Sequence, residues 1–344
     1  MIGALKKYLG WTDKTEIIVS AVGFPTSVAP ILQNQMRPKF VDIQMSDLNF
    51  DLDKVEAAIN KNTGAILVSP SLGNPPDMDR LDQLAKKHGI ELVLDGCDSL
   101  GSLWDGKPLS SHAIASTCSF YPAHHITTGE GGMVSVNDGE LEKVVRSLIN
   151  WGRDCYCSGI NNMLPNGTCG KRFSNWLPSV ACTVDHRYVY SNVGYNLKPL
   201  DLQGSIGLVQ IAKLPEVIRR RIDIKNRLQS VIEDGLAGFE VPDEHPKART
   251  SWFAVPIVAP NASMRNEIVR HLESKRIQTR NFFGGNILCH PAYSGLDDFR
   301  KYPLANQVIE RVFFLGCSPT LSEQMLKYVE ETLVEFGSLH ALAA

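Results

Sequence analysis

The stretch Glu91-Leu-Val-Leu-Asp95 is a short apolar run that ends in a carboxylate. An earlier stretch of the same kind is Ala65-Ile-Leu-Val-Ser69. Runs that are almost entirely apolar are typical of strands buried on both faces, as in a parallel sheet covered by helices. Ligands of such sheets bind beyond the carboxyl ends of the strands, so Asp95 is a candidate ligand-binding residue. The position alone does not decide this, because a carboxylate after a strand commonly serves only as a loop or capping residue.

Short β-branched runs and helical patterns alternate through the first two thirds of the chain. This alternation predicts an α/β fold with a mostly parallel sheet. The other expected strands are Glu16–Ser20, Lys39–Asp42, Thr117–Phe120 and Gly132–Val136, and the expected amphipathic helices are Asp51–Ile59 and Arg80–His88.

A smaller C-terminal α+β domain is predicted beyond a long helical stretch. That stretch runs from Gln203 to about Glu233, and we expect Pro215 to break or bend it. We place the division between a large domain, 1–212, and a small domain, 213–344. The expected elements of the small domain are the strands Ser251–Val258, Ile277–Phe283 and Val312–Leu315 and the helices Met264–Lys275 and Ser322–Phe336.

The composition is that of an ordinary globular chain of 344 residues, with 21% charged residues and a formal net charge of −2. No block of like charges indicates a polyanion-binding surface, and the basic clusters Arg219–Arg221 and Lys225–Arg227 are interpreted as a solvated helix face. No apolar run approaches the roughly 18 residues that span a membrane, and none follows the N-terminal lysines as in a signal peptide. Eight cysteines in such a chain favour reduced thiols. We therefore expect a cytoplasmic protein with no nucleic-acid or membrane partner.

A second segment with residues suited to binding or catalysis is Ser119-Phe-Tyr-Pro-Ala-His124-His125-Ile-Thr-Thr-Gly129-Glu-Gly-Gly132. It runs from the end of a predicted strand into a glycine-rich loop. The Ser119 hydroxyl could bind a phosphate, and His124 could move a proton near neutral pH. On composition alone, a turn with solvent-exposed histidines is the favoured interpretation.

This segment resembles the cofactor segment of the DegT-type sugar aminotransferases, a family of fold-type I pyridoxal-phosphate enzymes. Ordinary members carry a lysine five residues after the serine, where it forms a Schiff base with the cofactor; here His124 occupies that position. Members with histidine there are sugar 3-dehydratases, which use pyridoxamine 5′-phosphate (PMP) without covalent attachment. The resemblance covers essentially the whole chain and continues through Trp151-Gly-Arg-Asp154, Asp185-His-Arg-Tyr-Val-Tyr-Ser191, Gly194-Tyr-Asn-Leu-Lys198 and Phe313-Phe-Leu-Gly-Cys-Ser-Pro319.

The resemblance implies a fold-type I transferase fold and a set of residues that bind the cofactor. Phe24 would stack on the cofactor ring, Asp95 would face the pyridinium nitrogen, and Asp98 would flank the ring hydroxyl. Ser119 would hold the phosphate. Asn196 matches the asparagine that reaches the phosphate of the neighbouring subunit, which implies a homodimer with shared sites. His124 would be the catalytic base.

Four cysteines, Cys97, Cys155, Cys157 and Cys169, have the spacing C-x57-C-x-C-x11-C. This resembles the [2Fe–2S] ligand pattern of the CDP-4-keto-6-deoxyglucose 3-dehydratases, in which the final gap is usually shorter. Four thiolates are the ligand set of such a cluster. The alternatives are four independently buried thiols, or a structural zinc, which normally shows paired C-x2–4-C knuckles. The remaining cysteines, Cys118, Cys182, Cys289 and Cys317, are expected to be packing residues.

One family feature is not found ahead of Phe24. Family members carry a Gly- and Ser-rich loop there, followed by a helix whose N-terminus grips the cofactor phosphate. In this sequence Met1 is only 23 residues before Phe24. We therefore expect a sequence that begins late or a truncated homologue, with weakened cofactor binding.

The implied activity is the removal of the C3 hydroxyl from a nucleotide-linked 4-keto-6-deoxyhexose, with CDP-4-keto-6-deoxyglucose favoured, in the synthesis of 3,6-dideoxy sugars. It would use PMP and a [2Fe–2S] cluster. An NADH-dependent iron–sulfur flavoprotein reductase is the implied electron donor. The alternatives are a cluster-free sugar 3-dehydratase, a nucleotide-sugar aminotransferase of the same fold, and an inactive truncated homologue.

Overall fold

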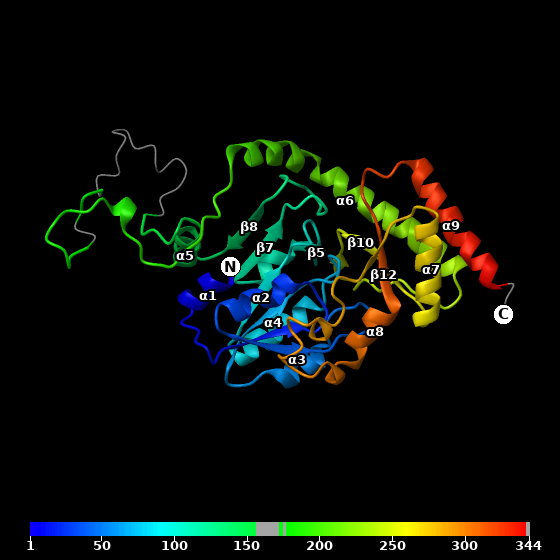
Figure 1. The fold of residues 1–344 in the computed structure, drawn as a ribbon, viewed down its shortest axis with the longest axis horizontal. Coiled ribbons are helices and arrows are strands. Elements are labelled where there is room, and N and C mark those ends of the chain that lie inside the picture. The colour runs from blue at the N-terminus through cyan, green and yellow to red at the C-terminus, as the bar shows by residue number, and fades with distance from the viewer. Residues whose placement is uncertain (156–171, 175–176, 342–344) are drawn as a thin grey trace.

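The computed structural model describes residues 1–155, 172–174 and 177–341 (Figure 1). Its centre is a sheet with the strand order β2-β1-β3-β4-β7-β8. Neighbouring strands run parallel except for β7 and β8, which are antiparallel. The predicted α/β fold with a mostly parallel sheet is therefore confirmed. The strands are β1 (Glu16–Ser20), β2 (Arg37–Val41), β3 (Thr63–Val68), β4 (Glu91–Asp95), β7 (Ala115–Ser119) and β8 (Gly132–Val136).

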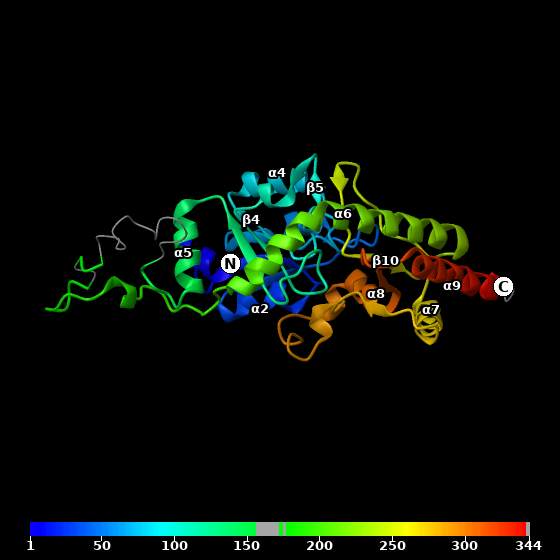
Figure 2. The same ribbon diagram turned by 90° about the horizontal axis from the view of Figure 1, so that it is seen from above.

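Helices cover both faces of this sheet, as the apolar strands require. Ile17 and Val19 of β1 belong to one buried cluster, and Ile18 between them belongs to another. Figure 2 shows α2 and α4 on opposite sides of the sheet. The helices on the first cluster are α1 (Ile2–Tyr8), α2 (Pro25–Gln33) and α5 (Gly139–Ile149), and those on the second are α3 (Leu52–Ala58) and α4 (Met78–His88).

The boundaries of several elements follow the sequence pattern closely. The strands β1, β4 and β8 have the predicted bounds. Three helices of the large unit, α1, α2 and α5, were not predicted. The signals of α1 and α2 are weak because α1 is short and α2 contains Pro30, a residue that normally argues against a helix in its interior. By contrast, α5 begins after the N-cap residue Asp138, a signal that the sequence does contain.

A second antiparallel sheet, β10-β12-β11, forms the C-terminal unit together with the helices around it. Its buried cluster takes residues from the second half of α6, from α7 and from α9. By contrast, α8 packs on the large unit, since Ala305 and Val308 belong to the cluster that holds α1 and α2. The elements are α6 (Asp201–Gly235), β10 (Ala254–Val258), α7 (Ala262–Ser274), β11 (Thr279–Asn281), α8 (Pro303–Arg311), β12 (Val312–Gly316) and α9 (Glu323–Ala341).

Short elements complete the described chain. A small sheet has the order β6-β5-β9. These strands are β5 (Leu103–Trp104), β6 (Lys107–Pro108) and β9 (Ala248–Arg249), and the 3-10 helices are Leu109–His112, His186–Tyr188, Ile287–Cys289 and Phe299–Lys301. None of the helices in the described ranges is long and apolar enough to cross a lipid bilayer.

The long helix α6 passes through Pro215 without a break. The helix changes direction along its length in both views (Figures 1 and 2), and the break expected as one alternative at the proline is not present. The predicted domain division after residue 212 lies inside this helix and stays a prediction.

A buried carboxylate joins the large unit to α8. Asp42 follows β2, is 2% exposed, and accepts hydrogen bonds from the backbone nitrogens of Leu304 at 3.2 Å and Ala305 at 2.8 Å. Lys54 Nζ lies 3.4 Å from the same carboxylate but is half-exposed. A carboxylate in this position satisfies two donors in the first turn of α8 and complements the positive end of the helix dipole.

We predict that Asp42→Ala lowers the free energy of unfolding by about 1–3 kcal/mol, because it leaves buried backbone donors without an acceptor. Urea denaturation would measure this loss. The matched control is Lys54→Ala, which removes only the partly exposed ion pair and should cost less than about 1 kcal/mol. Equal effects of the two substitutions would show that the helix contact is unimportant.

Candidate active site

A cavity with a volume of about 580 Å³ opens beyond the carboxyl ends of the parallel strands. Its floor is formed by residues at or just after β1, β3, β4 and β7, and Phe253 and Phe283 close it from the C-terminal unit. This is where ligands bind in open α/β sheets, and the volume suits a cofactor and part of a substrate. The candidate residues that line it are Phe24, Asp95, Asp98, Ser119 and His124, together with Cys97.

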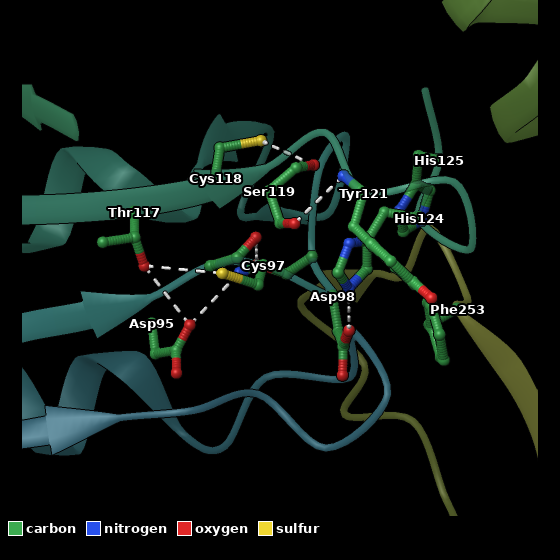
Figure 3. A network of polar contacts seen from close by, with 12 residues as sticks. Asp95, Cys97, Asp98, Thr117, Cys118, Ser119, Tyr121, His124, His125 and Phe253 are labelled. Carbon is green, nitrogen blue, oxygen red and sulfur yellow. Dashed lines mark hydrogen bonds and ion pairs between the residues drawn. The ribbon is translucent and has the colours of Figure 1, made fainter. Parts of the chain in front are cut away.

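Asp95 at the end of β4 is held by two hydroxyl groups. Ser27 Oγ donates to its Oδ2 at 2.6 Å, and Thr117 Oγ1 donates to its Oδ1 at 3.2 Å (Figure 3 shows the second contact). Both carboxylate oxygens therefore have fixed positions. A carboxylate oriented in this way can meet a protonated ring nitrogen on a ligand.

Ser27 and Thr117 were not predicted as site residues. Thr117 could have been found, because it precedes Ser119 by two positions on a strand and so lies on the same face. Ser27 lies in the first turn of α2, and no sequence signal connects it to Asp95, which is 68 positions away.

His124 forms a pair with Asp98. Its Nε2 lies 3.1 Å from Asp98 Oδ1 (Figure 3), and both side chains are largely buried. The imidazole packs against the ring of Phe253, with 5.3 Å between ring centres. Burial raises the pKa of Asp98, and the hydrogen bond with His124 opposes that shift. The remaining ring nitrogen, Nδ1, is buried and has no hydrogen-bond partner in the described structure.

The adjacent His125 has a different environment. It is 4% exposed, does not line the cavity, and its Nε2 lies 2.8 Å from the carbonyl oxygen of Ser251. Burial lowers the pKa of His125 to about 3, so the ring is neutral near pH 7. His125 is thus a packing residue, and the interpretation of both histidines as solvent-exposed is excluded.

Arg221 of α6 contacts the backbone of the segments that carry His124 and Phe253. It is 4% exposed and donates to the carbonyl oxygens of Phe253 at 2.7 Å and His124 at 3.4 Å. Lys225 is also 4% exposed, with its Nζ 4.6 Å from the centre of the Trp252 ring. The interpretation of these basic residues as a solvated helix face is therefore wrong for both, because this face of α6 packs against the C-terminal unit.

Of the other candidate cofactor-binding residues, two line the cavity and one does not. Ser119 Oγ accepts from the backbone nitrogen of Tyr121 at 3.2 Å at the end of β7, and Phe24 is 54% exposed at the start of α2. Both line the cavity. Asn196 does not: it bridges to Asn150, and its Oδ1 accepts from Lys198 Nζ at 2.7 Å.

Only part of the predicted cluster site can be placed. Cys97 lines the cavity, with its Sγ 3.7 Å from Thr117 Oγ1, and Cys155 is half-buried and not part of the lining. Burial and the nearby Asp95 raise the pKa of the Cys97 thiol. Cys157 and Cys169 lie outside the described residues. Within the described ranges no three His, Cys, Asp or Glu side chains gather as a metal site.

The remaining cysteines differ in how deeply they are buried. Cys317 is fully buried, as expected of a packing residue. Cys118 lines the cavity, and burial raises the pKa of its thiol to about 11. Cys182 and Cys289 are exposed, so the expectation that they pack in the interior is wrong.

Comparison with known proteins finds relatives that match most of the chain. The chain is 40% identical over 326 residues to the dTDP-4-dehydro-2,6-dideoxy-D-glucose 3-dehydratase of Saccharopolyspora spinosa, a match that covers 93% of this chain and 69% of that protein. It is 37% identical over 330 residues to the lipopolysaccharide biosynthesis protein RfbH of Salmonella typhimurium, covering 94% and 74%.

Among solved structures, the E. coli GDP-4-keto-6-deoxy-D-mannose-3-dehydratase with bound hydrated PLP superposes with a TM-score of 0.82 at 26% identity. That match covers 97% of this chain and 84% of the other. Residues 2–334 match the family described as the DegT/DnrJ/EryC1/StrS aminotransferase family. The chain therefore belongs to the DegT/DnrJ/EryC1/StrS aminotransferase family and has the fold of its pyridoxal-phosphate enzymes.

Proposed function

We propose that this chain is a PMP-dependent 3-dehydratase of a nucleotide-linked 4-keto-6-deoxyhexose. The observation that carries the proposal is His124, which stands where ordinary family members have lysine and which lines the cavity. Among the described residues of the cavity wall there is no lysine. Histidine does not form the stable covalent link that lysine makes with the cofactor, but it is a competent base.

The residues around the cavity fit the cofactor. When bound, PMP would supply an amine that condenses with the C4 ketone and a ring that takes up electrons. Asp95, fixed by Ser27 and Thr117, would bind the protonated ring nitrogen. Phe24 would cover one face of the ring, and Ser119 would contact the phosphate.

His124 would move a proton at the C4′ carbon of the cofactor. Its Nε2 is occupied by Asp98, which fixes the ring orientation and leaves Nδ1 as the exchanging nitrogen. Phe253 and Tyr121, packed on the imidazole, would keep water away from this nitrogen. The rate of proton transfer then depends on how precisely Asp98 and the two rings hold His124.

We predict that His124→Asn lowers dehydration by about 10²–10⁴-fold while PMP binding remains nearly intact, because a general base contributes that much to the rate. The measurements are turnover, exchange of the C4′ proton in D₂O, and an absorbance titration with PMP. The neighbouring control is His125→Asn, which removes a buried packing residue and should affect stability more than exchange. The reverse pattern would assign the base to His125.

A CDP-linked sugar is the proposed substrate, on the resemblance of the four-cysteine pattern to the CDP-4-keto-6-deoxyglucose 3-dehydratases. The relatives compared above include proteins named for dTDP- and GDP-linked sugars. Turnover of the CDP-, dTDP- and GDP-linked 4-keto sugars side by side would decide the nucleotide.

We also propose that Cys97, Cys155, Cys157 and Cys169 hold a [2Fe–2S] cluster, which would pass single electrons supplied by an NADH-dependent iron–sulfur flavoprotein reductase. The supporting observation is that Cys97 lines the same cavity as Asp95, with its backbone nitrogen 3.5 Å from Asp95 Oδ1. A ligand at Cys97 would therefore tie the cluster to the cofactor pocket.

Cys97→Ser is predicted to lose the cluster chromophore and the reductive turnover but to keep C4′ proton exchange, because only the electron supply is removed. Iron and sulfide analysis of anaerobically purified protein measures the cluster. Assays with and without the reductase measure reductive turnover and C4′ proton exchange. Cys118→Ser is the matched control, since Cys118 lines the same cavity but is not one of the four. A Cys97→Ser protein that keeps the cluster colour and full activity would contradict the cluster proposal.

A cluster-free 3-dehydratase is the second candidate, and one observation favours it. Cys97 lines the cavity whereas Cys155 does not, so these two proposed ligands have different surroundings. In that case Cys97 would only pack beside Asp95, and the metal analysis above would find no iron.

A homodimer is proposed from the surface of α6. Residues 202–212 contain no charged side chain, yet Leu202, Leu208 and Val209 are 69%, 74% and 57% exposed. A helix that is apolar on several sides is normally buried, and exposed apolar patches of this kind mark interaction sites. A second copy of the chain is the partner that the family resemblance implies.

Leu208→Asp is predicted to convert the dimer to monomers, because it would bury an unpaired charge in the contact. Sedimentation velocity at several protein concentrations measures the change. Arg219→Gln, an exposed substitution further along α6, is the control and should leave the dimer intact. A Leu208→Asp protein that sediments like the parent would remove α6 from the interface.

A further inference from the structure

A row of polar side chains crosses the carboxyl ends of three neighbouring strands. Ser69 directly follows the last paired residue of β3, and Asp95 directly follows the partner of that residue in β4. Asp95 is in turn paired with Thr117 of β7, and Figure 3 shows these two side chains in contact. The register therefore places Ser69, Asp95 and Thr117 in line across β3, β4 and β7.

The hydroxyl groups of Ser69 and Ser27 form a chain that ends at Asp95. Ser27 Oγ lies 3.2 Å from Ser69 Oγ and donates to Asp95 Oδ2 at 2.6 Å. A serine hydroxyl has one proton, and Ser27 uses its proton at the carboxylate. Ser69 is therefore the donor in the contact between the two serines. A hydroxyl that accepts a hydrogen bond is polarised and donates more strongly itself, so Ser69 strengthens the hydrogen bond from Ser27 to Asp95.

A second, small cavity lies beside these two serines. Its volume of about 10 Å³ is close to the space that one water molecule requires, and its wall includes Ser20, Ser27 and Ser69. Ser20 ends β1, and its Oγ accepts from the backbone nitrogen of Val22 at 3.0 Å, which leaves its proton to be donated. Ser69 Oγ uses its proton at Ser27 and can still accept. A water molecule in this cavity would accept from Ser20 and donate to Ser69.

We propose that Ser69 is a positioning residue for Asp95, acting through Ser27, and that one water molecule in the small cavity completes the chain. The inference rests on the proposed function, in which Asp95 binds the ring nitrogen of PMP. A carboxylate that is already held in one orientation loses less freedom when it binds a ligand, which favours binding. Ser69 also lines the larger cavity, so a direct contact between Ser69 and the ligand is the alternative that the experiments must separate.

The first test is a double-substitution cycle on the affinity of the full chain for PMP, measured by absorbance titration. Ser27→Ala should weaken binding by about 10-fold, because it removes a hydrogen bond to the carboxylate. Ser69→Ala should weaken binding by about 3-fold, because it removes only the polarisation of that hydrogen bond. In the Ser27→Ala background, Ser69→Ala should have no further effect. Losses that multiply independently in the double variant would overturn the proposal.

A cofactor analogue separates an effect on Asp95 from every other effect of the substitution. In the 1-deaza analogue of PMP, a C–H group replaces the ring nitrogen, so the ring offers Asp95 no N–H donor. Ser69→Ala should therefore weaken the binding of PMP and leave the affinity for the analogue unchanged. An equal loss for both ligands would show that Ser69 contacts the ligand directly or only supports the fold, and it would overturn the proposal.

Two further variants control for side-chain volume and for stability. Ser69→Cys keeps the size of the side chain but replaces the hydroxyl with a weak donor, so it should bind PMP as Ser69→Ala does. A Ser69→Cys protein with the affinity of the parent would show that volume matters and the hydrogen bond does not. Thr63 lies at the other end of β3, is 9% exposed, and accepts from the backbone nitrogen of Asn60 at 3.0 Å. Thr63→Ala should lower stability to urea and leave the affinity for PMP unchanged.

A crystal structure of the parent protein, at a resolution that shows ordered water, tests the end of the chain. One water molecule should lie within hydrogen-bond distance of Ser20 Oγ and Ser69 Oγ. A small cavity without density, in a structure that shows other buried waters, would overturn the water site.

The outcome is separable from that of the proposed reaction. A parent protein that shows the expected cycle with PMP but does not dehydrate would contradict the reaction and leave the positioning of Asp95 standing. A parent that dehydrates while the two losses multiply independently would contradict the positioning alone. A parent that does not bind PMP would overturn both.

Discussion

The strands β1, β3 and β4 at the centre of the sheet are buried on both faces, and this constraint determines where polar side chains can lie. Side chains along β1 alternate between two apolar clusters, so a polar group in the middle of such a strand would have no partner. Polar side chains therefore appear at the carboxyl ends, where Asp95 and Ser119 stand on neighbouring strands. The cavity is a consequence of this arrangement, because the loops that leave the strands diverge around it.

Arg221 connects the three parts of the molecule that surround this cavity. It belongs to α6, and its guanidinium donates to carbonyl oxygens of the loop that bears His124 and of the segment that bears Phe253. A buried guanidinium is costly unless its donors are satisfied. The position of the loop that bears His124 and that of the C-terminal unit are therefore linked through one side chain that does not line the cavity.

The surface between α5 and α6 contrasts with this closed centre. The first half of α6 is apolar and exposed. An exposed apolar helix is unfavourable for an isolated subunit. The second copy of the chain proposed above would cover this helix.

The sequence by itself determined the parallel sheet, the strands β1, β4 and β8, and the position of Asp95 at the carboxyl end of β4. These features follow from local patterns, since a strand buried on both faces must be apolar and must end in polar groups. The roles proposed for Phe24, Asp98, His124 and the four cysteines rest on the family resemblance rather than on such patterns. Only the tertiary structure decided that Ser27 fixes Asp95, that His124 pairs with Asp98, and that Arg221 is buried. The physical reason is that each of these contacts joins separate elements across the fold, and neither periodicity nor composition records which side chains meet there.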